Sequence, residues 1–123
     1  MQSEHILVHV TTGSAEEAEA LGAAMVAQRL AASAQVEPIT TSHYRWKGAI
    51  HAPPEHRVTF FSRAALWDAI VAFVRANHSY ELPQIVATPI ALGLPEFLSW
   101  IDENTRALEQ ESDEVQEARD DID

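Results

Sequence analysis

The chain lacks cysteine entirely, since none of its 123 residues is Cys. This absence excludes disulfide bonds, thiolate nucleophiles and cysteine-based zinc or iron–sulfur sites, and it fits a reducing compartment. Apolar runs are also short, and none approaches the roughly 18 residues that a membrane-spanning helix needs. The N-terminal segment MQSEHILVHV has no basic n-region and alternates apolar with polar residues, unlike a signal peptide. We therefore expect a cytoplasmic protein with a single folded core and no membrane partner.

Basic residues are scarce: 8 Lys and Arg face 19 Asp and Glu, a net charge of −11. Eight of these acids and one base fall in the segment from Glu109 onward, which leaves 11 acids and 7 bases, a net charge of −4, for the rest. No basic stripe is present to neutralise phosphates, which disfavours nucleic acid as a partner. We expect a folded domain over residues 1–107 and a disordered acidic tail over residues 108–123.

Hydrophobic periodicity predicts strands and helices in alternation. Ser14 and Glu17 have the spacing of a capping box, which starts a helix. The expected elements are a strand over 4–12, a helix from the Ser14 cap to about Ala32, a long strand over 35–48 broken near Pro38 with a reversal at Lys47-Gly48, a strand over 57–61, a helix over 63–77 capped by Ser62, a strand over 85–90 and a third helix beginning at Pro95. Pro89 in the last strand predicts either a sheet edge or a place where strand pairing stops.

This order predicts an α+β, ferredoxin-like βαββαβ fold, in which two helices cover one face of an antiparallel sheet and a C-terminal helix follows. The opposite face and the long hairpin then carry apolar and aromatic side chains with no helix to cover them. We expect these to be Leu7, Tyr44, Trp46 and Phe61. Because large exposed apolar patches mark interfaces, the chain is expected to act as a homo-oligomer.

The reactive groups available are mainly histidines. No G-x-G-x-x-G, P-loop or G-x-S-x-G pattern is present. The six histidines form no H-x-H pair, and His5 and His9, which have the H-x-x-x-H spacing, lie in a predicted strand and not in a helix, so no metal site is encoded within one segment. The string His78-Ser-Tyr80-Glu81 places an imidazole, a phenol and a carboxylate just after a predicted helix. Either His78 only interacts with the helix dipole, or His78 and Glu81 act as ligands or as an acid and a base.

Aromatic residues form a second cluster. Tyr44 and Trp46, at positions i and i+2 of a predicted strand, share one of its faces. Such a pair is typical of a core or an interface, and against another subunit it would line a small-molecule pocket. Trp67 and Trp100 follow helical patterns and are expected to pack.

Several strings taken together resemble the CutA family of divalent-cation tolerance proteins over about residues 4–105. They are Val10-Thr-Thr, Leu30-Ala-Ala, Tyr44-Arg-Trp46-Lys-Gly48, Glu55, His78-Ser-Tyr80-Glu81-Leu-Pro83-Gln-Ile85, Pro89-Ile and Phe97-Leu-Ser-Trp100-Ile-Asp-Glu-Asn-Thr105. The resemblance implies a ferredoxin-like subunit in a tight homotrimer, tolerance of copper and other divalent metals, and no enzymatic activity. It also implies an architecture like that of the trimeric PII signalling proteins, which bind small effectors between subunits.

The chain departs from the family pattern at several positions. Ser33 stands where members usually carry Cys, so a thiolate suited to copper(I) is missing. Ala49 and Phe61 stand where basic residues are usual, which weakens the case for an anionic effector. His43 and Lys47 replace residues that are more often apolar and acidic.

Two functions follow from the residues and the resemblance. The first is a homotrimeric, non-catalytic divalent-metal tolerance protein that binds copper(II), zinc or nickel in inter-subunit clefts, with His78 and Glu81 as ligands. The second is a PII-like signalling module that binds a small metabolite or a protein partner at the trimer interface. The cleft or interface residues expected for both are Tyr44, Trp46, Glu55, Tyr80, Pro83 and Trp100. A third reading, an acid–base enzyme using His78 and Glu81, lacks a readable orienting residue or oxyanion motif.

Overall fold

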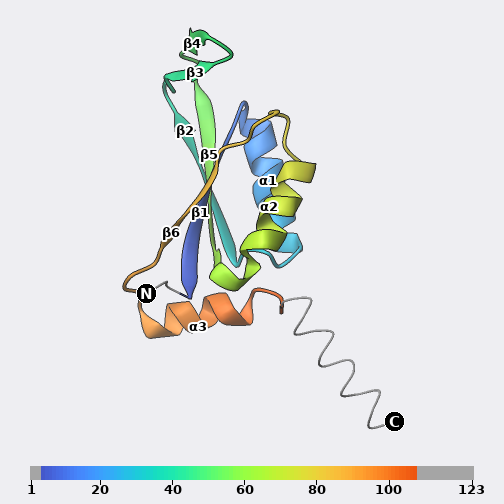
Figure 1. Ribbon diagram of the computed structural model, residues 1–123. Helices are drawn as coiled ribbons and strands as arrows, with labels where there is room; N and C mark the ends of the chain where they lie inside the picture. Colours follow the sequence, from blue (N-terminus) through green and yellow to red (C-terminus); the bar gives the residue numbers. More distant parts are fainter. Residues whose placement is uncertain (1–3, 108–123) are drawn as a thin grey trace, which may run out of the picture.

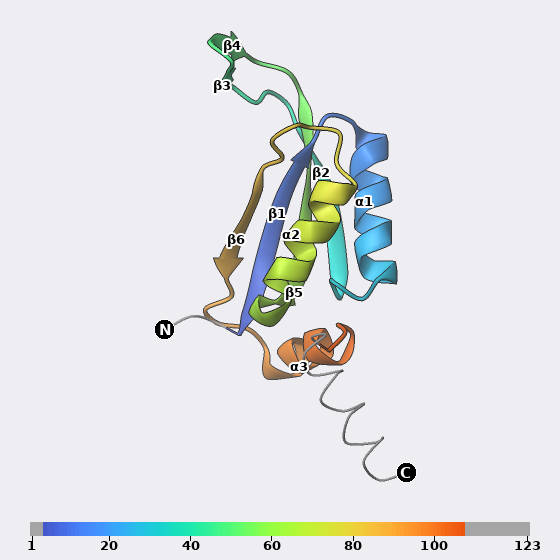
Figure 2. The ribbon, with the colours of Figure 1, turned by 45° about the vertical axis from the view of Figure 1, so that its right-hand side comes forward.

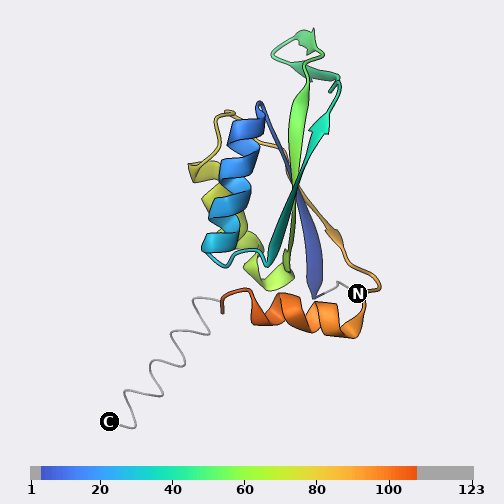
Figure 3. The same cartoon turned by 180° about the vertical axis from the view of Figure 1, so that it is seen from behind.

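The computed structural model describes residues 4–107, and its centre is a four-stranded antiparallel sheet in the order β2-β5-β1-β6 (Figure 1). The strands are β1 (His5–Thr12), β2 (Ser33–Ile39), β5 (Glu55–Arg63) and β6 (Ile85–Pro89). Helices α1 (Ala15–Ala27) and α2 (Trp67–Ala76) lie on the same face of the sheet (Figure 2), and α3 (Pro95–Glu103) crosses one end of it (Figure 3). The predicted ferredoxin-like βαββαβ fold is thus confirmed, while the predicted tail lies outside the described residues.

The core lies between the sheet and helices α1 and α2. Val8 pairs with Phe60 of β5 and with Ala87 of β6, so these side chains share the face that the helices cover. The fully buried core side chains include Val8, Val10, Met25, Val58, Phe60, Ile70 and Val74. Burying a side chain of this size contributes about 1.5–3 kcal/mol, so this layer supplies most of the driving force for folding.

Helix α1 ends at Ala27, earlier than the predicted end at Ala32. Arg29 adopts the left-handed conformation with φ of 58°, and the Leu30 N–H donates back to the Met25 carbonyl at 3.0 Å. This reversal carries Leu30 into the core, where it is 1% exposed. Leu30 is therefore buried as predicted, but it belongs to a turn and not to the helix.

The predicted long strand over 35–48 is wrong in one respect, because the structure divides it. Strand β2 ends at Ile39, which pairs with Glu55, the first residue of β5, so no partner strand continues beyond it. The chain then leaves the main sheet and forms a two-stranded sheet of its own from β3 (Tyr44–Trp46) and β4 (Ala49–His51), which stands away from the body (Figure 1).

The β3–β4 hairpin closes through the predicted reversal. Lys47 and Gly48 have φ of 50° and 81°, and a two-residue type I′ turn needs positive φ at both central positions. Tyr44 and Trp46 consequently lie on a hairpin, as expected, but on one that forms a sheet separate from the main sheet.

The second helix begins at Trp67, after a 3₁₀ turn over Ala64–Leu66, and not at Arg63. Arg63 remains in β5, where it pairs with the first residue of β1. Ser62, the predicted cap, is fully buried and donates its hydroxyl hydrogen to the Leu30 carbonyl at 2.6 Å. Pairing with β1 therefore extends the strand through the position where the cap was expected.

The sheet face opposite α1 and α2 is only partly covered. Leu7 and Phe61 lie opposite each other on this face, and both are half-buried. Helix α3 reaches one end of it with Phe97, whose ring meets the Phe61 ring edge-on at 5.7 Å. Val86 on β6, which is the edge strand that Pro89 predicted, is 48% exposed. The apolar side chains Leu7, Phe61 and Val86 therefore remain partly open on this face, beside the polar His9.

Candidate functional site

A cleft of about 510 Å³ lies where the end of β1, the start of β5, the β3–β4 hairpin and the segment between α2 and β6 meet. It is lined by Thr11, Ser42, His43, Tyr44, Arg45, Trp46, Glu55, Ser79, Tyr80, Glu81, Leu82 and Gln84. Five of the predicted site residues thus meet in one cavity, although they come from three separate parts of the sequence. Pro83 and Trp100 are not part of its lining.

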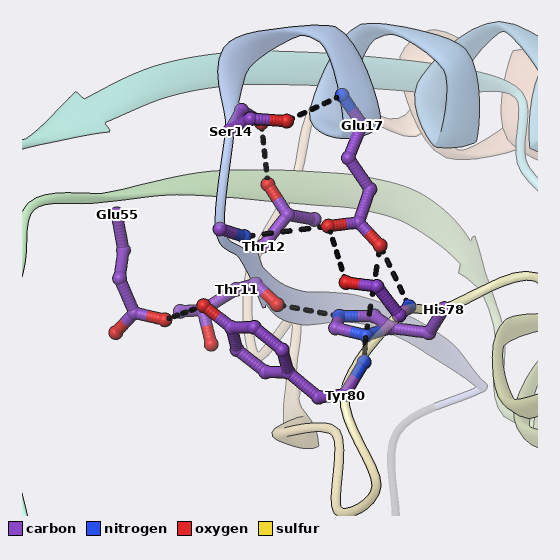
Figure 4. A network of polar contacts seen from close by, with 9 residues as sticks. Thr11, Thr12, Ser14, Glu17, Glu55, His78 and Tyr80 are labelled. Atoms are coloured by element: carbon purple, nitrogen blue, oxygen red, sulfur yellow. Dashed lines mark hydrogen bonds and ion pairs between the residues drawn. The ribbon is translucent and has the colours of Figure 1, made fainter.

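His78 fixes the position of the segment between α2 and β6, which forms one wall of the cleft (Figure 4). Its Nε2 donates to the Thr11 carbonyl at 2.7 Å, and its Nδ1 accepts the Tyr80 N–H at 3.0 Å. Because a carbonyl can only accept, this geometry requires the neutral tautomer with the proton on Nε2. The side chain is fully buried. His78 therefore ties its own segment to the end of β1, and neither ring nitrogen is open to the cleft.

Glu17 holds the same segment from the other side. Its carboxylate accepts the Ser79 N–H at 2.8 Å, the Ser79 hydroxyl at 3.0 Å and the Gly13 N–H at 3.4 Å, and it lies 3.8 Å from Nδ1 of His78. Only one of the two hydrogen bonds of the predicted capping box is formed. The Ser14 hydroxyl accepts the Glu17 N–H at 3.1 Å. The Glu17 carboxylate accepts hydrogen bonds from Ser79 and not from the Ser14 N–H. The N-terminus of α1 is in this way coupled to the cleft.

These contacts make stability depend on pH through Glu17. Burial alone would raise the pKa of Glu17, but the hydrogen bonds from Ser79 and Gly13 outweigh it and lower the pKa below 4.5. A lowered folded-state pKa stabilises the protein above about pH 4.5, and this contribution is lost as the pH falls through the folded value.

We expect Glu17→Gln to reduce the fall in the urea midpoint of unfolding between pH 5 and pH 3. Glu19→Gln, a change at an exposed position of α1, is the control, and parallel curves for the wild type and Glu17→Gln would contradict the prediction.

Tyr80 and Glu55 meet at the cleft (Figure 4). The Tyr80 hydroxyl donates to Oε2 of Glu55 at 2.8 Å. Burial, this hydrogen bond and the adjacent charge of Glu55 raise the pKa of Tyr80 well above its usual value, so the phenol keeps its proton. A Cβ at Gly13 would lie 3.1 Å from the Tyr80 hydroxyl oxygen, tighter than a usual contact. The absence of a side chain at Gly13 therefore allows Tyr80 to reach Glu55.

Glu81 lies at the mouth of the cleft. Its Oε2 is 3.0 Å from Nζ of Lys47, and both side chains are mostly exposed. Nζ of Lys47 also lies 5.5 Å from the centre of the Trp46 ring. The ion pair connects the β3–β4 turn to the segment after α2, but an exposed pair of this kind contributes at most about 1 kcal/mol. Glu81 can therefore exchange Lys47 for another cation at little cost.

The remaining predicted residues lie in different places. The Tyr44 ring stacks on His51 within the hairpin, with 5.4 Å between ring centres. Trp100 lies on α3, at the end of the sheet far from the hairpin (Figure 1), where it stacks on Phe97 at 5.4 Å. Trp100 is 39% exposed, so its predicted role can only be that of an interface residue and not of a cleft residue.

One chain does not supply a metal site. Residues 4–107 contain no group of three or more His, Cys, Asp or Glu side chains that could hold a metal ion. The two predicted ligands are not brought together: His78 is buried with both nitrogens hydrogen-bonded, and Glu81 is exposed beside Lys47. Because a bound divalent ion takes four or more ligands, the described donors of a single chain do not fit a metal, and a second chain would have to complete the set.

Sequence reasoning missed the supports of this site. Glu17 was assigned to capping alone, and the role of Gly13 in admitting Tyr80 was not predicted. Arg45, Ser42 and Gln84 line the cleft without belonging to any pattern that marks a ligand. The sequence did contain one indication of this support, namely Glu17. A carboxylate three residues after a helix cap can accept hydrogen bonds from donors outside its own helix, as Glu17 does from Ser79.

Comparison with known proteins gives one consistent family. The family model described as CutA1 divalent ion tolerance protein matches residues 6–104. The divalent-cation tolerance protein CutA of Archaeoglobus fulgidus is 38% identical over 99 residues, which are 80% of this chain and 96% of that protein. A solved structure of the periplasmic divalent cation tolerance protein CutA from the same organism has a TM-score of 0.80 at 37% identity and covers 83% of this chain and 99% of its own.

A plant relative is longer. Protein CutA 1, chloroplastic, of Oryza sativa subsp. japonica is 33% identical over 101 residues, 82% of this chain, and the chain spans 57% of its length. The names of these relatives place them in a chloroplast and a periplasm, so the comparisons do not support the expected cytoplasmic location. Within residues 4–107, no helix has the length and apolar character needed to cross a membrane.

Proposed function

The chain belongs to the CutA1 family of divalent ion tolerance proteins, and from this membership we propose that it is a non-catalytic homotrimer that binds a divalent cation, copper(II) foremost, in clefts between subunits. The observation that carries the proposal is the cleft itself. It gathers Glu55, Glu81 and His43 on one lining, yet the described part of the chain forms no complete donor set. A neighbouring subunit is the natural source of the missing donors.

The open sheet face supports assembly. Leu7, Phe61 and Val86 remain partly uncovered opposite the helices. The β3–β4 hairpin also projects beyond the main sheet (Figure 1). Both features are expected when another copy of the chain packs on the sheet and against the hairpin, because that packing removes apolar surface from water.

Glu81 is the ligand that we assign to this chain. It is exposed at the mouth of the cleft, and its one ion pair with another residue of the described range 4–107 is the weak one with Lys47. His78 can coordinate a metal through Nδ1 only by releasing the Tyr80 N–H, so we assign it mainly to holding the segment that carries Glu81. Imidazole and carboxylate donors without thiolate favour copper(II), zinc or nickel over copper(I).

Isothermal titration calorimetry with copper(II) and zinc(II) tests this assignment. Glu81→Gln removes the charged ligand at the mouth, and we expect it to weaken uptake at least about tenfold. Glu19→Gln removes a charge of the same type from the exposed side of α1 and should leave uptake unchanged. Equal affinity in the wild type and Glu81→Gln would exclude Glu81 as a ligand.

A second function, a signalling module that binds a small molecule in the cleft, is favoured by a different observation. The volume of about 510 Å³ lies within the range of small-molecule pockets and far exceeds the space that an ion needs. A thermal-shift screen of metabolites, followed by calorimetry, tests it. A trimer that no metabolite stabilises would count against this function while leaving metal binding intact.

A further inference from the structure

Glu55 differs from the other acidic residues of the cleft because it is buried. The residue is 4% exposed, whereas the Glu81 side chain is 71% exposed. Oε2 of Glu55 accepts the Tyr80 hydroxyl at 2.8 Å (Figure 4), and Oε1 has no hydrogen-bond donor among residues 4–107. The described part of the chain contains no enclosed side-chain polar atom without a partner, so Oε1 must open onto the cleft that Glu55 lines.

A carboxylate in this position is costly to leave unpaired. Removing a charge from water is unfavourable unless a counter-charge or hydrogen-bond donors replace the water. Tyr80 supplies one donor, and no Lys or Arg of the described chain forms an ion pair with Glu55. The free oxygen is therefore a preformed acceptor for a ligand that carries its own N–H donors and positive charge.

The remaining lining suits an organic cation. Tyr44, Trp46 and Tyr80 contribute aromatic rings, and ring faces attract cations. The negative charge of Glu81 is already matched by Lys47. Arg45 is the one Lys or Arg side chain in the described lining, and it belongs to an exposed residue of the hairpin. Glu55 is thus the buried charge of the lining, and no ion pair is formed between it and the exposed Arg45.

We infer that the cleft binds a small organic cation, an amidinium, a guanidinium or a primary ammonium, whose N–H groups donate to Oε1 of Glu55 beside the aromatic side chains. The inference rests on the second proposed function and deepens it by naming the class of ligand. It does not depend on metal binding, for which we assigned Glu81.

A pair of probes with the same shape and opposite charge tests the class of ligand on the wild-type protein. Benzamidinium and benzoate are both planar, but only benzamidinium carries N–H donors and positive charge. Calorimetry is expected to show saturable binding of benzamidinium, methylguanidinium or butylammonium, with at least about tenfold weaker binding of benzoate. Absence of binding for all three cations, or benzoate binding as tightly as benzamidinium, overturns the inference.

A pair of variants tests the residue. Glu55→Gln keeps the size of the side chain and an oxygen that can accept the Tyr80 hydroxyl, but removes the charge. We expect it to weaken binding of the cation at least about tenfold. Glu37→Gln makes the same change on β2 outside the cleft and should retain wild-type affinity. Equal loss in both variants, or undiminished binding in Glu55→Gln, contradicts a site on Glu55.

The failure of this inference is distinguishable from the failure of the proposed functions. Native mass spectrometry of the same samples reports the oligomeric state and the retained copper independently of the organic probes. A trimer that binds a metabolite of another charge class but none of the cations leaves the second function standing and rejects only the ligand class. If Glu55→Gln does not fold, the comparison of benzamidinium with benzoate on the wild type still decides the question.

Discussion

Replacing His78 with Ala is expected to lower the free energy of unfolding by about 2–4 kcal/mol. The imidazole is fully buried and makes two hydrogen bonds, to the Thr11 carbonyl and from the Tyr80 N–H. Truncation leaves both backbone groups without their partner, and each buried unsatisfied group costs about 1–3 kcal/mol. Urea denaturation of wild type and variant measures the loss.

The neighbouring residue provides a matched control for this substitution. Asn77 also donates a side-chain hydrogen bond, from Nδ2 to the Phe73 carbonyl at 2.8 Å, but at an exposed position. Asn77→Ala should therefore cost less than about 1 kcal/mol. Hydrogen exchange should also show that the Tyr80 amide exchanges faster in His78→Ala. A cost for His78→Ala no larger than that of Asn77→Ala would mean that His78 does not hold this wall of the cleft.

Leu7→Asp is expected to abolish trimer formation at micromolar concentration. Leu7 lies in the central strand β1 on the open sheet face, opposite Phe61. An unpaired carboxylate buried between subunits costs several kcal/mol, which corresponds to an association weakened at least about a thousandfold. Size-exclusion chromatography with light scattering measures the assembly state across concentrations.

The control for Leu7→Asp lies on the other side of the molecule. Val26 is 39% exposed on α1, in the layer that covers the opposite face of the sheet. Val26→Asp makes a similar apolar-to-acid change there and should remain trimeric. Circular dichroism confirms that each variant is folded. A folded Leu7→Asp protein that still forms trimers would place the subunit interface elsewhere.

The elements of the fold could be predicted from the sequence because their signals are local. Alternation marks β1, the Ser14 cap marks the start of α1, and Lys47-Gly48 marks a turn. The boundaries that were wrong depend on contacts between distant residues. Arg29 adopts a left-handed conformation after the end of α1, and this turn brings Leu30 into the core. Ser62 does not cap a helix because it pairs within the sheet and its hydroxyl donates to the Leu30 carbonyl.

The sequence could predict which residues belong to the site, but not which of them contact one another. His78, Tyr80 and Glu81 lie within four residues of the sequence, and Glu55 is a separate carboxylate that the resemblance also includes. The bond between Tyr80 and Glu55 spans 25 positions, and the bond between Glu17 and Ser79 spans 62, so neither has a local signature. His78 and Glu81 also have different roles, although they are three residues apart. His78 is buried and holds its segment in place, whereas Glu81 is exposed at the mouth of the cleft. Hydrophobic periodicity does not predict this difference in burial.

We propose above that three copies of the chain form clefts that each take up a divalent ion. Native mass spectrometry of the purified protein with and without copper(II) measures both the assembly and the metal uptake. We expect a species of three times the 13.6 kDa chain mass that retains three copper ions, one for each cleft. A monomer under all conditions, or a trimer that retains no copper, would contradict it.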